Sequence, residues 1–410
     1  MGAFKPEKIS PPDPKPEDAS QPRRSWFVNH PKKTLFILLA SVFCIMLFVT
    51  EKILALKANT HISGIKRSIR LREYDPLLYR FQSYNDPEKK VFDSFTQKTY
   101  VLRIDRNGFI MPSKIHEHPD YVIVFLGAST TECTWVDEEN KFPYLVGRLL
   151  EKETGLKINS YNASKPGNNT LHSIDVLFNK LIPLKPNIVV MMHNVNDVNV
   201  LLYENTYWNH NPYRSPIAED KPSLVKEFKK IRDLLIPYVY AGLKECIRFV
   251  RGSKEVDEFK KVRGKKRQPI DQAYLAHEFR LNLETFIQIC KIRGIIPVLM
   301  TQQNRIKSHP DRVILRQLNL FGQSKGMTYA DYKEIYDLFN QTIRETGAKN
   351  GVMVIDLAQK IPPEKDFLFD AIHLTDQGSK LAATIIREKL RPLIRTSAPK
   401  PLKGSDPQNN

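Results

Sequence analysis

Cysteine is scarce in this chain of 410 residues, and no internal repeat is evident. Of its four cysteines, Cys44 lies in an apolar run, and the other three show neither metal-ligand spacing nor a disulfide framework. The sequence therefore predicts neither a metal site nor a scaffold held together by disulfides. Cysteine usage gives no indication of the cellular compartment.

Acidic residues are too few to balance the basic ones. Lysine and arginine number 63 against 45 aspartates and glutamates, which gives a formal net charge of +18. Such an excess is compatible with nucleic acid, with an anionic membrane surface and with an acidic polysaccharide. The basic segment 263–267 (RGKKR) has no recognised nucleic-acid-binding module around it, so we expect no nucleic-acid partner. The apolar content of 41% is ordinary, which excludes wholesale disorder.

One long run lacks charge altogether, Thr34–Thr50 (TLFILLASVFCIMLFVT). As a helix it would span about 26 Å, close to the thickness of a hydrocarbon core. The run is apolar on all sides and follows a polar, proline-rich segment, which disfavours a buried core helix. No small-x-small cleavage site follows it. We expect an uncleaved transmembrane anchor over residues 34–56, with the lipid bilayer as its partner.

The charges around this span do not decide its orientation. The twenty residues on each side contain equal numbers of lysine and arginine, so the positive-inside rule gives a tie. Single amino-terminal anchors commonly export the domain that follows them. We therefore expect a cytoplasmic amino terminus and an extracytoplasmic catalytic domain.

Composition divides the remainder of the chain. Residues 1–33 are rich in Pro, Lys, Asp and Glu and predict a disordered tail, and residues 395–410 predict a second one. Residues 57–120 predict a stalk and an irregular extension with short strand-like pieces. A regular alternation of apolar and amphipathic stretches occupies residues 121–394.

This alternation predicts the fold. Strands are expected at 121–126, 157–161, 188–192, 294–301 and 352–357. Helices are expected at 141–154, 171–182, 332–346 and 375–390. The order predicts an α/β domain in three layers, α/β/α, around a parallel five-stranded sheet. A partly helical insertion over about 203–278 interrupts it, and could be a lid, a partner surface or a solvated decoration.

Two segments far apart in the sequence carry the residues of a serine hydrolase. Ser129 follows the strand 121–126 after a glycine turn, at the carboxyl end where open α/β sheets bind ligands. Asp370 and His373 lie three residues apart and could supply an orienting carboxylate and a base. Each segment alone is weak evidence for a catalytic site. Serine, for example, is also a common residue at helix starts.

Two further segments make the pattern specific. Gly167 lies in KPGNN after the second predicted strand, and Asn196 lies in NVND after the third. With Ser129 in GAST and His373 in DAIH, the chain resembles the SGNH (GDSL-like) hydrolase superfamily over about 122–390, apart from the insertion. That superfamily has four blocks, which supply Ser, Gly, Asn and His in this order. The resemblance implies a flavodoxin-like sheet.

The resemblance also implies a role for each residue. Ser129 would be the nucleophile, His373 the general base and Asp370 the group that orients the imidazole. The backbone amides of Ser129 and Gly167, with the side chain of Asn196, would form the oxyanion hole. No metal ion or organic cofactor is implied.

Two positions depart from the superfamily pattern. Ala128 stands where aspartate is common, and Asn194 where glycine is common. Neither carries the proton transfer, so we expect activity to be retained. Asn168, His193 and Asn194 are candidates for the substrate pocket, although a packed histidine at a strand end is the commoner case for His193. Asp197 is expected to be structural.

These inferences predict a membrane-anchored serine esterase that hydrolyses O-acyl esters, foremost acetyl esters, on an envelope polysaccharide or lipid. Two alternatives stay open. The same residues could transfer the acyl group to a glycan acceptor, which would require a donor-supplying partner. The domain could also be a non-catalytic scaffold for surface-glycan assembly, which the intact Ser, Gly, Asn, Asp and His disfavour. The sequence identifies no protein partner.

Overall fold

The computed structural model describes residues 26–57, 71–83, 99–209, 270–323 and 327–396, with a few isolated positions between 211 and 243. The chain divides into two compact units, one with the amino-terminal helices and one with the sheet. Most of the two predicted tails lies outside the described residues. Residues 26–29 and 31–33 of the first tail are helical.

An apolar helix forms most of the described amino-terminal unit. Helix α2 (Pro31–Lys57) follows the short α1 (Trp26–Asn29). Proline suits the first position of a helix because its missing N–H would have no partner there. The stretch Pro31–Ile53 comprises 23 residues, of which almost none is buried. At about 1.5 Å per residue such a helix reaches about 35 Å. By length and composition α2 could therefore cross a membrane.

The second unit is built on a sheet of five parallel strands. They are β3 (Tyr121–Gly127), β4 (Ile158–Asn162), β5 (Ile188–Met192), β6 (Ile296–Thr301) and β7 (Met353–Asp356). Their order is β4-β3-β5-β6-β7, and every neighbouring pair is parallel. The five predicted strands are thereby confirmed. Because they are parallel, their carboxyl ends all lie at one edge of the sheet.

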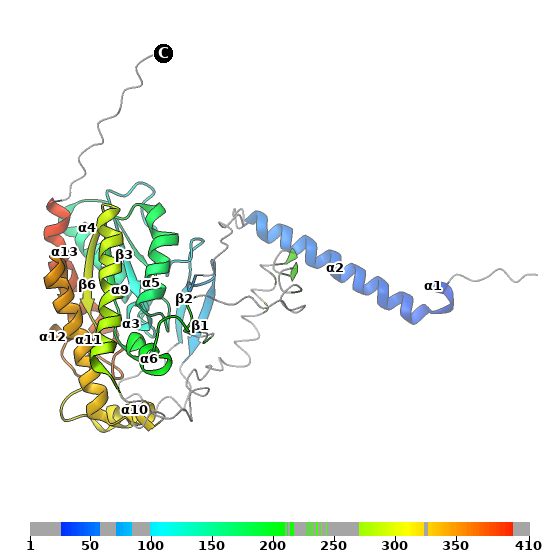
Figure 1. Cartoon of the computed structure of the whole chain (residues 1–410). Helices are drawn as coiled ribbons and strands as arrows, with labels where there is room; N and C mark the ends of the chain where they lie inside the picture. Colours follow the sequence, from blue (N-terminus) through cyan, green and yellow to red (C-terminus); the bar gives the residue numbers. More distant parts are fainter. Residues whose placement is uncertain are drawn as a thin grey trace, which may run out of the picture. The chain divides into compact units, whose positions relative to one another are not determined.

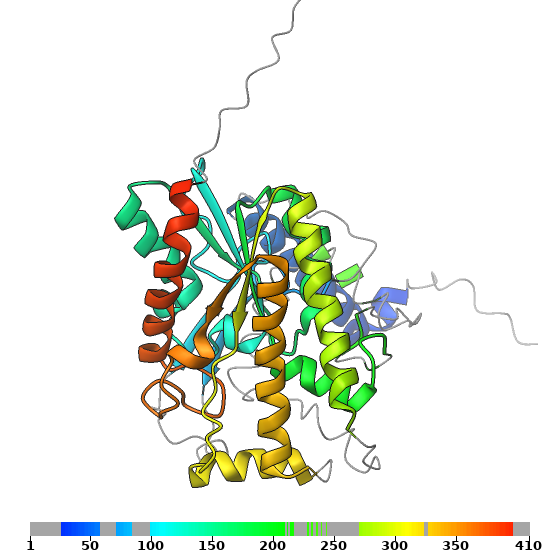
Figure 2. The same ribbon diagram turned by 60° about the vertical axis from the view of Figure 1, so that its left-hand side comes forward.

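Helices cover both faces of this sheet, which gives the predicted three layers (Figures 1 and 2). Helices α4 (Phe142–Thr154) and α13 (Asp376–Thr396) share one apolar core with Ile123 of β3. On the other face, α5 (Thr170–Val176), α9 (Gln272–Ile292) and α11 (Tyr329–Asn350) share a second core with Val124. Since both faces are covered, every residue of β4 and β5 is buried.

Part of the predicted insertion belongs to this core. Helix α9 begins at Gln272, inside the range 203–278, and its apolar residues Leu275, Phe279 and Phe286 are buried against the sheet. Residues 217–227 and 244–269 lie outside the described residues. The idea that the insertion forms a lid therefore stays a prediction.

The extension before the sheet also packs on the domain. Strand β1 (Tyr79–Ser83) pairs antiparallel with β2 (Thr99–Arg103). Ile110 donates its backbone N–H to the carbonyl of Asn162, at the end of β4, at 3.0 Å. The described part of the predicted stalk, from Leu71 onward, therefore belongs to the unit that contains the sheet.

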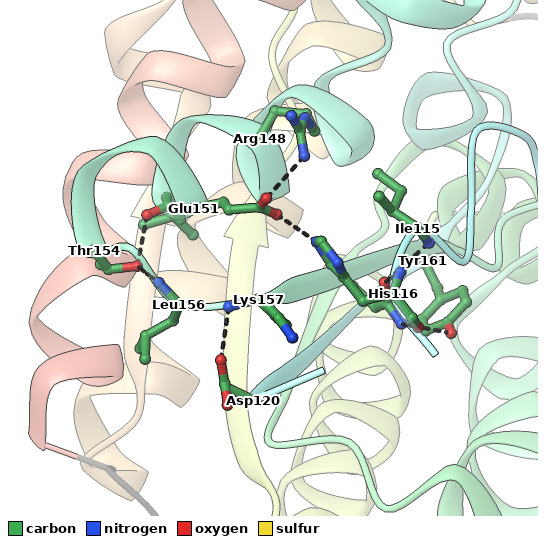
Figure 3. A network of polar contacts seen from close by, with 11 residues as sticks. Ile115, His116, Asp120, Arg148, Glu151, Thr154, Leu156, Lys157 and Tyr161 are labelled. Carbon is green, nitrogen blue, oxygen red and sulfur yellow. Dashed lines mark hydrogen bonds and ion pairs between the residues drawn. The ribbon is translucent and has the colours of Figure 1, made fainter. Parts of the chain in front are cut away.

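A polar network closes the amino-terminal edge of the sheet (Figure 3). The side chain of Asn159 accepts the backbone N–H groups of Ile115 and His116 at 3.0 and 2.9 Å, and donates to the His116 carbonyl at 2.8 Å. His116 Nε2 lies 2.9 Å from Glu151 Oε2, and Arg148 donates to Glu151 Oε1 at 3.0 Å. These bonds tie the segment before β3 to α4 and β4.

Glu151→Gln should lower stability at neutral pH by less than about 1 kcal/mol, since partly exposed ion pairs are screened by water. Burial tends to raise the pKa of Glu151, but its hydrogen bond with His116 and the charge of Arg148 outweigh burial and hold the pKa below its usual range. A lowered folded-state pKa stabilises the protein above the unfolded-state value, about 4.3, and this contribution disappears as the pH falls through the folded-state value.

Chemical denaturation of the two proteins should therefore give separate curves at neutral pH that converge below about pH 4. Glu139→Gln, at an exposed position on the same domain, is the matched control and should leave the curves superimposed at both pH values. A separation that does not change with pH would contradict the assignment.

Candidate active site

Residues from four segments reach solvent at the carboxyl edge of the sheet. Ser129 follows β3, Gly167 follows β4, Asn196 follows β5, and His373 lies on the loop after β7. All four are partly exposed, whereas both chain neighbours of Ser129 and of Asn196 are buried. The residues of the four predicted blocks are thus accessible to solvent.

The turn from β3 into α3 (Ser129–Glu132) presents Ser129 as the first residue of a helix. Glycine is needed at Gly127, because a Cβ there would lie 2.0 Å from the Thr131 hydroxyl. The carbonyl of Ala128 accepts the N–H groups of Thr131 and Glu132 at 3.1 and 2.8 Å, so the helix starts directly after the strand. This geometry places the serine hydroxyl at the edge of the sheet.

A buried lysine fixes the other end of α3. Lys141 donates to the carbonyls of Glu132 and Cys133 at 3.0 and 2.7 Å. Burial raises the pKa of the Cys133 thiol to about 11, so it stays protonated and unreactive. Burial also raises the pKa of Glu132, despite the neighbouring positive charge of Lys141. Within the described ranges, no group of three His, Cys, Asp or Glu side chains could hold a metal ion.

Ser129, His373 and Asp370 form a continuous hydrogen-bonded chain. Ser129 Oγ lies 2.9 Å from His373 Nε2, and His373 Nδ1 lies 2.6 Å from Asp370 Oδ2. The other carboxylate oxygen accepts the backbone N–H groups of Ile372 and His373 at 2.8 and 2.7 Å. Since a carboxylate only accepts hydrogen bonds, Nδ1 carries the imidazole proton and Nε2 can accept one from Ser129.

The charge state of Asp370 supports this arrangement. Burial alone would raise its pKa, but the charge and hydrogen bond of His373 and the backbone N–H of Ile372 outweigh burial. The pKa of Asp370 therefore lies below its usual range, and the side chain stays a carboxylate at neutral pH. The ring of Phe369 stacks on the imidazole with 5.6 Å between centroids, which further restricts its orientation.

The loop 368–374, which carries Asp370 and His373, is held by residues that follow β6. Gln303 donates to the carbonyl of Ile372 at 2.9 Å. The backbone N–H of Arg305 donates to the carbonyl of Ala371 at 2.7 Å. Sequence reasoning missed these contacts, because polar side chains after a strand do not show which loop they will meet.

A helix that the sequence analysis did not predict supports the same loop. Helix α10 (Arg312–Gln323) places Gln317 so that its side chain accepts the N–H of Ala371 at 3.1 Å. Ile314 and Leu318 are buried with Ala371 in a small apolar cluster. The apolar residues of α10 recur at helical spacing, and this pattern could have predicted the helix from the sequence.

A tight turn presents Gly167. The N–H of Asn168 donates to the carbonyl of Lys165 at 3.1 Å, which closes a turn with Pro166 second and Gly167 third. Gly167 has a φ of +77°. Proline followed by a positive-φ glycine is the signature of a type II turn. The N–H of Lys165 donates to the carbonyl of Gly127 at 3.3 Å, so the turn is tied to the strand that ends at the serine.

The side chain of Asn196 meets the same turn. Its Nδ2 donates to the carbonyl of Asn168 at 2.8 Å, and an asparagine amide has a second N–H to offer. The three predicted pocket residues, Asn168, His193 and Asn194, are only 1%, 2% and 1% exposed. They have little surface to present to a substrate, and their role in binding one stays a prediction.

A second Ser-His-Asp set lies inside the domain. Ser173 Oγ is 2.6 Å from His193 Nε2, and His193 Nδ1 is 3.7 Å from Asp197 Oδ2. All three residues are buried, and burial lowers the pKa of His193 to about 3. Asp197 accepts the N–H of Thr170 and the hydroxyl of Tyr207 at 2.9 and 2.7 Å, which confirms its structural role. Since this serine has almost no solvent exposure, Ser129 is the candidate nucleophile.

Gln302 connects two of the four segments. Its Nε2 donates to Thr130 Oγ1 at 2.8 Å, and its Oε1 accepts the N–H of Val195 and the hydroxyl of Tyr336 at 3.1 and 2.8 Å. Thr130 is the neighbour of Ser129, and Val195 starts α6 (Val195–Glu204). One buried side chain thus sets the spacing between the turn that carries Ser129 and the segment that carries Asn196.

A parallel sheet with the partly exposed Ser129 and His373 and the buried Asp370 at its carboxyl edge defines a serine hydrolase of the three-layer α/β class. The model of the GDSL-like lipase/acylhydrolase family matches residues 125–381. The chain therefore belongs to this family, and the predicted superfamily is confirmed. The protein is accordingly an ester hydrolase.

Several solved structures resemble this chain. A lipase/acylhydrolase from Enterococcus faecalis is 18% identical, with a TM-score of 0.38 over 67% of this chain and 96% of its own. A GDSL-like lipase from Bacteroides thetaiotaomicron is 12% identical, with a TM-score of 0.37 over 67% and 89%. An acetylxylan esterase from Geobacillus stearothermophilus is 14% identical, with a TM-score of 0.37 over 66% and 94%. No curated protein sequence matches the chain significantly.

Gln302→Met should lower kcat for a model ester about tenfold or more, because the serine turn and α6 would lose their shared bond. It should also cost about 2 kcal/mol of folding stability, since the N–H of Val195 would be buried without a partner. Tyr121→Phe is the matched control. It removes a buried hydrogen bond of 3.0 Å, to the carbonyl of Ile394, at the opposite end of β3. A folded Gln302→Met enzyme with wild-type kcat would contradict the bridging role.

Proposed function

We propose that the protein is a membrane-anchored serine esterase that removes acetyl groups from an envelope polysaccharide. Family membership gives ester hydrolysis. The observation that carries the serine mechanism is the chain from Ser129 through His373 to Asp370 at the carboxyl edge of the sheet.

The proposed reaction proceeds in two halves. Ser129 Oγ attacks the ester carbonyl while its proton passes to His373 Nε2, and Asp370 stabilises the imidazolium that forms. The imidazolium returns the proton to the departing alcohol, which leaves the acyl group on Ser129. A water molecule then attacks this acyl-enzyme, with His373 again as base, and releases the carboxylic acid with the free serine.

The oxyanion of each tetrahedral intermediate needs hydrogen-bond donors. We assign this role to the backbone N–H groups of Ser129 and Gly167 and to the second amide N–H of Asn196. The positive φ of Gly167 and the bond between Asn196 and the same turn support the assignment. Loss of one such donor typically costs about 3 to 4 kcal/mol of transition-state stabilisation.

The amino-terminal helix and the net charge support the choice of substrate. Helix α2 is long and apolar enough to hold the enzyme at a membrane, within reach of polymers attached to the envelope. A net charge of +18 would attract an acidic polysaccharide. We propose that the catalytic domain faces the extracytoplasmic side, where such polymers are assembled and modified.

The two Ser-His-Asp sets give a direct test with matched variants. Ser129→Ala should lower kcat for p-nitrophenyl acetate by at least about a thousandfold, because no other group can form the acyl-enzyme. Ser173→Ala removes the buried hydroxyl beside His193 and should keep kcat within about fivefold of wild type, since a side chain that is 1% exposed does not reach the substrate. If Ser173→Ala abolished turnover and Ser129→Ala retained it, the active site would be the buried Ser173 set instead.

The substrate is tested by the products that the full-length enzyme releases in detergent. It should liberate acetate from an O-acetylated acidic polysaccharide faster than long-chain fatty acid from a phospholipid. Faster release of fatty acid would contradict the polysaccharide. Transfer of acetyl groups to an added glycan in preference to water would contradict hydrolysis and indicate a transferase.

A further inference from the structure

The chain upstream of the family domain contributes to the site. The family match begins at residue 125, yet the segment Arg72–Tyr74 packs on the turn that presents Gly167. We call this segment the upstream strap. Both the strap and the turn belong to the catalytic unit.

Two backbone carbonyls of the strap accept hydrogen bonds from the glycine turn. The carbonyl of Arg72 accepts Asn168 Nδ2 at 3.0 Å, and the carbonyl of Glu73 accepts Lys165 Nζ at 2.6 Å. The Lys165 ammonium also lies 5.5 Å from the centroid of the Tyr74 ring. The strap therefore holds the first and the last residue of the turn.

The strap is itself fixed to the domain. The Glu73 carboxylate pairs with Lys180 at 2.7 Å, and the Lys180 side chain is only 4% exposed. Lys180 also donates to the carbonyl of Gly108 at 3.0 Å. Tyr74 is buried, and its hydroxyl faces the Glu132 carboxylate on the helix that begins with the serine. A partly buried ion pair and a buried aromatic ring leave the upstream strap little freedom to move.

Asn168 connects the upstream strap to two of the three predicted oxyanion donors, Gly167 and Asn196. Its N–H closes the turn that carries Gly167, and its side chain donates to Arg72. Its carbonyl accepts the amide of Asn196 at 2.8 Å. A displacement at Asn168 would therefore move the backbone N–H of Gly167 and the side chain of Asn196 together.

We infer that the upstream strap and Asn168 position the oxyanion hole. The inference rests on the proposed function, because it takes Gly167 and Asn196 as oxyanion donors. Asn168 is a positioning residue in this account, rather than the substrate contact that its place in the sequence suggested. The upstream strap lies before the family-matched region. That region alone therefore lacks some of the contacts that hold the oxyanion hole in place.

Asn168→Asp in the full-length protein is the test. The variant keeps the shape of the side chain but replaces the Nδ2 donor with an oxygen that cannot bond the Arg72 carbonyl. We expect kcat for p-nitrophenyl acetate to fall about tenfold or more while KM changes less than about twofold, because misplaced donors affect the transition state more than substrate binding. An alkylboronic acid, whose tetrahedral adduct uses the same donors, should lose affinity by a similar factor.

Asn159→Asp is the matched control. Asn159 is also 1% exposed and also donates its Nδ2 to a backbone carbonyl, that of His116, but at the opposite edge of the sheet. It should lower the melting temperature without changing kcat or the boronate affinity. Equal kcat and boronate affinity in Asn168→Asp and wild type would overturn the inference.

Lys165→Met is the second variant, in case Asn168→Asp fails to fold. The Lys165 side chain is only half-buried, so its loss should be tolerated. Its kcat and boronate affinity should fall together, and Lys165→Arg, which keeps a donor for the Glu73 carbonyl, should restore both. If a folded Lys165→Met enzyme kept the wild-type kcat and boronate affinity, the positioning role of the upstream strap would be contradicted. If wild type itself shows no turnover that depends on Ser129, the proposed function fails instead.

Discussion

Parallel pairing of the five strands is the constraint on which the whole site depends. Strand β3 lies between β4 and β5, so the segments that follow these three strands meet at one edge of the sheet. Ser129, Gly167 and Asn196 stand in those segments, and the long loop after β7 returns His373 to the same edge. Several helices on each face bury the strands, which leaves the carboxyl edge as the place where polar groups can emerge.

Buried polar side chains then convert this coarse arrangement into a defined geometry. A buried amide or guanidinium must find partners, because leaving it unpaired costs about 1 to 3 kcal/mol. Around this site the partners belong to the functional loops. Gln303 donates to the carbonyl of Ile372 and the Arg305 guanidinium to the carbonyl of Leu368, both on the loop of His373. Gln302 bonds the segments of Ser129 and Asn196, so hydrogen bonds that stabilise the fold also set the geometry of the site.

Much of this could be predicted from the sequence, for physical reasons. Strands covered on both faces read as short apolar runs, so the sheet and its order of helices were recognisable. Ser129, Asp370 and His373 were recognisable because their chemistry depends on residue type and on position after a strand, and the structure brings them within hydrogen-bonding distance. Asp197 was expected to be structural, and its hydrogen bonds confirm that.

The supporting contacts could not be predicted. Gln302 reaches residues more than a hundred positions away, and a glutamine at a strand end carries no sign of such a partner. The carbonyls of Arg72 and Glu73 act through the backbone, which is the same in every sequence. The partner of the buried His193, Ser173, likewise lies on another segment, and no local pattern reveals that pairing.

The central claim is that Ser129 is an activated nucleophile at the carboxyl edge of the sheet. Reaction of the full-length enzyme with a fluorophosphonate tests this claim most directly. Mass spectrometry of the digested protein then locates the modified residue. The account predicts a single adduct on Ser129 that is absent from Ser129→Ala. An adduct on Ser173, or a folded enzyme that stays unmodified, would contradict it.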